Sequence, residues 1–91
     1  MTNNFEVGDI VISNAGRDEG RVYIISSIVD KDFVMLVDGN FKKLINPKKK
    51  RVKHLKKSGI KVESIAEKLL SDKKVFDTEV YSAIKNCEIN K

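Results

Sequence analysis

Tryptophan is absent from the 91 residues, and cysteine, proline and histidine each occur once. The single cysteine, Cys87, excludes an internal disulfide, and one cysteine with one histidine cannot supply the four ligands of a structural zinc site. No apolar run approaches the roughly 20 residues of a membrane-spanning helix, and the N-terminal residues lack the basic start and apolar core of a secretory signal. We therefore expect a cytoplasmic protein with no metal, no cofactor and no membrane partner.

The patterns that mark common enzyme active sites are also missing. The sequence has no P-loop and no glycine fingerprint for dinucleotides. Cys87 falls on the apolar face of an expected helix, where a packed thiol is far more common than a nucleophile, and no triad partner is indicated for His54. Asp18 and Glu19 fall in an expected turn, where carboxylates are usually solvated. We expect no catalytic residue and no enzyme activity.

Acidic residues are missing from one long stretch, so the net charge of +5 is unevenly distributed. Residues 1–38 contain seven acidic and three basic side chains, and residues 63–91 contain six acidic and five basic ones. Residues 39–62 contain ten basic side chains and no acidic one. The excess positive charge is therefore confined to this one segment.

The densest part of that segment is the run from Pro47 to Lys57. Cations packed together without counter-charges repel one another, and a polyanion relieves the repulsion by releasing its condensed counterions. A solvated basic face, a nuclear-localisation signal and a membrane-surface signal are alternative interpretations. Val52 and Leu55 interrupt the run and indicate a packed strand, which favours contact with a phosphate backbone.

Short β-branched runs separated by turn residues predict a mainly β domain, and 91 residues suffice for about one domain. The two- and three-residue connections leave no room for crossover helices, so the sheet must be antiparallel. Five strands at this spacing favour a small closed barrel. The expected strands cover residues 9–13, 21–29, 33–37, 41–45 and 51–55.

The apolar period becomes helical beyond Gly59. A first helix is expected to begin at Val62 or Ser64, and Ser64 with Glu67 could form a capping box. Asp77 is the expected N-cap of a second short helix.

Two regions follow from these elements. We expect residues 1–58 to form the barrel, with its basic segment at 42–57. Residues 59–91 should form a helical extension that packs on the barrel or on a protein partner. The charges of the extension nearly balance, so it should add little attraction for a polyanion.

Two glycines bracket a charged loop with the sequence AGRDEGR at 15–21. Gly16 and Gly20 allow a sharp bend or the close approach of a ligand. Arg17 and Arg21 suit phosphate recognition and stacking on bases. The alternative interpretation is a β-turn whose charges are merely exposed.

The segment GDIV at 8–11, followed by the two loop glycines and an apolar strand, resembles the KOW motif of ribosomal proteins and transcription elongation factors. The segments AGRDEGR, IVD, FV and KRVKHL then follow in the same order. With them, residues 6–57 resemble the large-subunit ribosomal KOW proteins of the fourteen-e type. They resemble still more a set of short bacterial KOW-domain RNA-binding proteins related to those.

That resemblance implies an SH3-like barrel and a non-enzymatic ribosomal or ribosome-associated protein that docks its loop and a basic strand on ribosomal RNA. Glu19 departs from the pattern, because many KOW loops have a basic residue there, so we expect no phosphate contact from it. Together with the basic segment, the resemblance predicts RNA contacts from Asn14, Arg17, Arg21, Lys42, Lys43, Lys48, Lys49, Lys50, Arg51, Lys53, His54, Lys56 and Lys57, with Gly16 and Gly20 shaping the loop backbone.

Two other functions remain open. SH3-like barrels also bind peptides, usually in a groove lined by aromatic side chains, and a transcription-linked KOW protein would bind DNA. Base stacking is expected to be minor, because most of the two tyrosines and four phenylalanines fall in strands assigned to the core. We expect a monomer when free, with ribosomal proteins as candidate partners of the helical extension.

Overall fold

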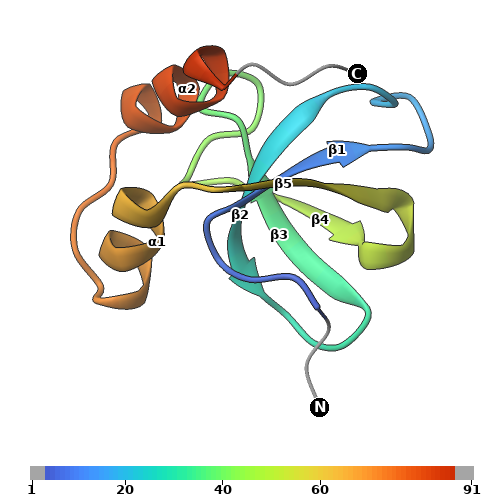
Figure 1. Cartoon of the computed structure of the whole chain (residues 1–91), viewed down its shortest axis with the longest axis horizontal. Helices are drawn as coiled ribbons and strands as arrows, with labels where there is room; N and C mark the ends of the chain where they lie inside the picture. The colour runs from blue at the N-terminus through green and yellow to red at the C-terminus, as the bar shows by residue number, and fades with distance from the viewer. Residues whose placement is uncertain (1–3, 88–91) are drawn as a thin grey trace.

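The computed structural model describes residues 4–87, which form a curled antiparallel sheet followed by two helices (Figure 1). The strands are β1 (Asp9–Ser13), β2 (Val22–Ile28), β3 (Phe33–Val37), β4 (Lys48–Arg51) and β5 (Leu55–Lys61). A 3₁₀ turn, Val52–His54, joins β4 to β5, and the helices are α1 (Glu63–Leu70) and α2 (Asp77–Asn86). The prediction of a mainly β domain with two C-terminal helices is confirmed.

The strand order is β4-β3-β2-β1-β5, with every neighbouring pair antiparallel. Within residues 4–87 the edge strands β4 and β5 do not pair, so the sheet is compatible with a small SH3-like barrel but is not closed. The 3₁₀ turn bridges the open side. The Val52 N–H donates to the carbonyl of Asp32 at 2.8 Å, and the carbonyl of His54 accepts from the Asn14 N–H at 2.9 Å.

The prediction of a strand at residues 41–45 is wrong, because this segment is a loop. The carboxylate of Asp38 accepts from the backbone N–H of Asn40 at 2.9 Å and of Lys42 at 2.8 Å, which closes a tight turn. The Leu44 N–H donates to the carboxylate of Asp77, at 2.7 Å, in α2. These backbone groups are thus satisfied by side chains instead of by a ladder, and the fourth strand begins only after Pro47.

The fifth strand is also displaced from its expected position at 51–55. Residues 52–54 form the 3₁₀ turn, and β5 begins at Leu55, which is buried. The strand then continues through Gly59 to Lys61, so it crosses the expected boundary between residues 58 and 59. The basic segment and the start of the helical extension therefore share one strand.

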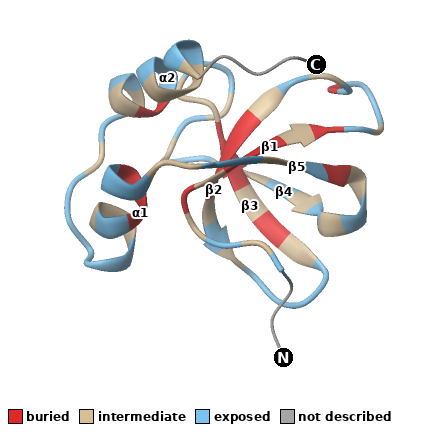
Figure 2. Cartoon of the chain, in the orientation of Figure 1, coloured by how far each residue is buried: buried red, intermediate tan, exposed pale blue. Residues whose placement is uncertain are grey.

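Both faces of the sheet are covered over much of β1, β2 and β3, which explains the nearly continuous apolar runs in these strands (Figure 2). Successive residues of a strand point to opposite faces. One set lies inside the curl, namely Val11, Tyr23, Ile25, Val34, Leu36 and Leu55. The other set packs against the two helices, namely Ile10, Ile24 and Val37 with Ile65 of α1 and Val80 of α2. The helices therefore complete the core of the sheet.

The first turn of each helix differs from the expected capping. Helix α1 has Val62 as its N-cap, and no described side chain caps it, so the capping box of Ser64 and Glu67 is not formed. In α2 the N-cap is Phe76, and its N–H donates to the carboxylate of Glu79 at 3.1 Å. Asp77 is the first helical residue, and its carboxylate is used by the 41–47 loop.

Helix α2 lies directly against the turn that follows β3. Gly39 in this turn has φ of +78°, and a Cβ atom there would lie 2.7 Å from the backbone nitrogen of Tyr81. Only glycine combines this backbone conformation with such a close approach. The turn and the helix are thus fixed to each other.

Candidate nucleic-acid interface

Strand β4 divides the basic run into two sets of side chains that point in opposite directions. Lys48 and Lys50 are half-buried, whereas Lys49 and Arg51 are exposed. This alternation follows from the two-residue period of a strand. A run of four cations therefore presents two of them to solvent and two to the loop at 15–21.

The partner of the half-buried lysines is Asp18, which is only 6% exposed. The Lys50 ammonium lies 2.9 Å and the Lys48 ammonium 3.1 Å from its two carboxylate oxygens. The hydroxyls of Ser13 and Tyr23 donate to the same carboxylate at 2.8 and 3.2 Å. The expectation of a solvated turn carboxylate at Asp18 is therefore wrong.

Two pKa values reflect this environment. Burial opposes ionisation of Asp18, but the hydrogen bonds from Lys50, Ser13 and Lys48 outweigh it and hold the pKa of the carboxyl well below its usual range. Burial, together with the neighbouring carboxylate, raises the pKa of Tyr23 to about 12. The Asp18 charge is thus permanent at neutral pH, and it compensates part of the charge of both lysines.

The same contacts attach the glycine-bracketed loop to β4. The Lys50 ammonium also donates to the carbonyl of Ala15 at 3.1 Å, so its side chain connects two points of the loop. Gly16 and Gly20 have φ of +85° and +90°, as a tight loop requires. Arg17 and Glu19 project from the loop and are exposed. The structure therefore brings the loop and the basic strand onto one surface.

The outer cations of β4 lie over an aromatic ring. The ammonium of Lys49 and the guanidinium of Arg51 are each 4.8 Å from the centre of the Phe33 ring. Cations in this geometry are attracted to the ring face, and both side chains remain exposed. The two side chains are thereby held in place on the surface while their charges stay accessible.

The other residues expected to contact RNA differ in their exposure to solvent. Asn14, Lys43, Lys53 and Lys56 are exposed, whereas Lys42 and His54 are half-buried. Arg21 is exposed and its guanidinium lies 4.5 Å from the centre of the Phe41 ring.

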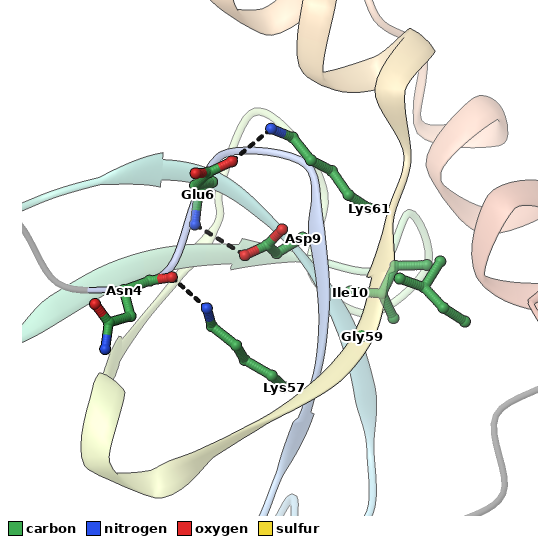
Figure 3. A pocket seen from close by; sticks show the side chains of 8 residues that line it. Asn4, Glu6, Asp9, Ile10, Lys57, Gly59 and Lys61 are labelled. Carbon is green, nitrogen blue, oxygen red and sulfur yellow. Dashed lines mark hydrogen bonds and ion pairs between the residues drawn. The ribbon is translucent and has the colours of Figure 1, made fainter.

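Lys57 has a different environment, shown in Figure 3. Its ammonium donates to the carbonyl of Asn4 and lies 5.3 Å from the centre of the Phe5 ring. It lines a cleft of about 270 Å³ that also contains Glu6 and Asp9. Lys57 thus belongs to a surface of mixed charge that the N-terminal segment builds with β5.

Two features of this surface were not recognised from the sequence. The role of Asp18 depends on lysines about 30 positions away, and an isolated carboxylate in a loop gives no sign of them. Phe41, assigned to a core strand, is 68% exposed. Tyr81 and Phe76 in the helical extension are exposed as well, whereas Tyr23 in β2 is buried as expected.

No protein-family model matches the sequence. The large ribosomal subunit protein eL14 of Methanococcus vannielii is 38% identical over 58 residues, which cover 64% of this chain and 69% of that protein. The chain belongs to the eL14 family. The resemblance to large-subunit ribosomal proteins of this type is thereby confirmed.

Residues 4–87 contain no group of three or more histidine, cysteine, aspartate or glutamate side chains that could hold a metal ion. Over the same range, neither helix combines the length and the apolar character that crossing a bilayer demands. The Cys87 thiol packs against the core beneath α2, and burial raises its pKa, which disfavours the reactive thiolate.

Proposed function

We propose that this eL14-family protein is a non-enzymatic RNA-binding protein that docks on structured ribosomal RNA through phosphate contacts. The observation that supports this most strongly is that Asp18 forms ion pairs with both Lys48 and Lys50. They hold the glycine-bracketed loop against the basic strand, so that exposed cations from both elements face solvent together. Arrays of fixed cations neutralise phosphates and position a protein on folded RNA.

The expected contact residues should contribute unequally to RNA binding. Arg17, Lys49 and Arg51 are exposed and their charges have no carboxylate partner among the ion pairs described above, so they are the principal phosphate contacts. Lys50 is the weakest candidate, because its side chain is only 11% exposed and its ammonium is occupied by Asp18. The contributions of Asn14, Arg21, Lys42, Lys43, Lys48, Lys53, His54, Lys56 and Lys57 are proposed to be secondary.

The salt dependence of binding tests this function. With roughly 4–6 phosphate contacts, the logarithm of the association constant for a structured RNA hairpin should fall against the logarithm of salt concentration with a slope of about −3 to −5. The double variant Lys49→Ala, Arg51→Ala should flatten the slope by about one unit or more. The matched control Lys73→Ala, Lys74→Ala removes the same charge between the helices and should leave the slope unchanged.

Other outcomes separate the alternatives. A slope near zero for the unmodified protein would contradict phosphate binding, because peptide docking in an apolar groove depends little on salt. Equal competition by duplex DNA and by structured RNA would favour a transcription-linked protein. Stronger competition by structured RNA supports the proposed function.

A further inference from the structure

We propose that Phe41 and helix α2 form a cleft for one unpaired RNA base, next to the phosphate-binding surface. This inference rests on the proposed RNA-binding function and adds the class of RNA that is recognised. Its starting point is the exposure of Phe41, whose side chain lies in the loop before β4 and is 68% exposed. A large aromatic side chain held in solvent on a cationic surface is typical of a stacking site for nucleic acid bases.

The Phe41 ring is held on a rigid support. The turn that precedes it is closed by the hydrogen bonds to the carboxylate of Asp38, and Gly39 packs against α2. The guanidinium of Arg21 lies over the ring at 4.5 Å from its centre. Because the guanidinium covers one face, the exposed area falls on the other face and on the edge.

Two neighbouring clefts share Arg21 and Phe41 as part of their walls. The first has a volume of about 350 Å³, and Tyr81 and Asn40 also line it. The second has a volume of about 380 Å³, and its other lining cations are Arg17, Lys42 and Lys48. Both volumes lie in the range of about 300–1,000 Å³ that small-molecule sites occupy.

The two clefts match the two halves of a nucleotide. The first offers two aromatic rings and the amide of the exposed residue Asn40, which suits a flat base with a hydrogen-bonding edge. The second is lined by several basic side chains and by one carboxylate, that of Asp18. Its excess of positive charge suits a phosphate group. An acidic peptide would satisfy the cations but would leave the Phe41 ring without a flat partner. A paired duplex would supply phosphates but would keep its bases stacked within the helix.

The proposal predicts a loss of affinity that depends on the unpaired base. The probes are an RNA hairpin with one unpaired adenosine, the same hairpin fully paired, and inorganic polyphosphate. The variant Phe41→Ala should bind the hairpin with the unpaired base about tenfold or more weakly, the effect expected for one stacked base. Binding of the paired hairpin and of polyphosphate should change less than twofold.

Phe76 provides the matched control. It is also an exposed phenylalanine, 56% exposed, with the ammonium of Lys74 at 5.4 Å from its ring centre, but it lines neither of the two clefts. Phe76→Ala should leave the affinity for all three probes unchanged. Tyr81→Ala should weaken binding of the unpaired-base hairpin in the same direction as Phe41→Ala, because Tyr81 lines the first cleft.

A spectroscopic measurement tests stacking directly. The chain has no tryptophan, so Phe41→Trp introduces a single indole at the proposed site. Its emission should be quenched by the hairpin with the unpaired base and much less by the paired hairpin. Phe76→Trp reports quenching that is independent of the site.

The outcomes distinguish this inference from the proposed function. If the unmodified protein binds both hairpins with a steep salt dependence but Phe41→Ala loses no affinity, the base cleft is refuted and phosphate docking stands. If neither hairpin binds, the proposed function fails, and the cleft fails with it. If poly-glutamate binds in a way that requires Phe41, the cleft recognises an acidic protein segment and the inference is overturned.

Discussion

Replacing Asp18 by asparagine removes one buried negative charge and keeps the shape of the side chain. The carboxylate accepts hydrogen bonds from two hydroxyls and lies in ion pairs with Lys48 and Lys50. In the Asp18→Asn protein both ammonium groups lose their counter-charge, and the amide directs a donor toward one of them. We therefore expect the variant to fold less stably, with the loop at 15–21 held less firmly.

The size of the effect follows from the burial of the partners. Removing one member of a fully buried ion pair costs about 3–5 kcal/mol. Here the Lys50 side chain is 11% exposed and that of Lys48 32%, so solvent compensates part of the loss. We expect the free energy of unfolding to fall by about 2–3 kcal/mol at neutral pH.

The effect should depend on pH in a direction set by the lowered pKa of Asp18. A carboxyl group whose pKa is lowered by folding stabilises the folded state fully above its unfolded pKa of about 3.9. Below that pH the unfolded state takes up the proton first, and each pH unit removes about 1.4 kcal/mol of the contribution. The difference between the two proteins should thus shrink to about 1 kcal/mol or less near pH 2.5.

Urea denaturation at pH 7 and near pH 2.5, followed by circular dichroism, measures both quantities. Glu19→Gln is the matched control, because it removes an exposed carboxylate one residue away and should change stability by less than about 0.5 kcal/mol. A destabilisation by Asp18→Asn that is equally small, or one that is the same at both pH values, would refute the proposed role of the buried charge.

Three further variants test the loop and the core. Gly20→Val should lower both stability, by about 1 kcal/mol or more, and RNA affinity, because φ is +90° at this position; thermal melts and hairpin titrations check this. Arg17→Ala should lower hairpin affinity without changing the melting temperature, and equal affinity would reduce the loop to a simple turn. Ile65→Ala should cost about 2–5 kcal/mol in urea denaturation, because this side chain is 2% exposed between α1 and the sheet, and a change below 1 kcal/mol would show that α1 is not part of the core.

Local sequence patterns were sufficient for most of the sheet. The strands expected at 9–13 and 33–37 have those bounds in β1 and β3, and β2 falls within the expected range 21–29. In each case a β-branched run is bounded by glycine, aspartate or asparagine, so the extended conformation and its ends are both determined within a few residues. The resemblance to the eL14 family was likewise visible in short segments and their order.

The segments at 41–45 and 51–55 could not be predicted in this way, because tertiary contacts override their local strand pattern. Residues 41–45 are no less apolar than a strand, but the Leu44 N–H is satisfied by Asp77, 33 positions away. The strand predicted at 51–55 is likewise displaced, because residues 52–54 form the turn that leads from β4 at one edge of the sheet to β5 at the other.

The sequence by itself determined the strand-rich class, the two helices and the confinement of positive charge to one segment, because propensity, turn chemistry and charge are properties of neighbouring residues. Only the tertiary structure decided which cations are accessible. The pleat of β4 turns Lys49 and Arg51 outward and Lys48 and Lys50 toward Asp18, which lies in a different loop. It likewise decided that Phe41 is exposed, because β4 takes the place beside β3 where the strand at 41–45 was expected to pair, and this segment remains a loop held by α2. Burial and charge compensation depend on contacts between residues that are distant in the sequence. A pattern of neighbouring residues does not specify those contacts.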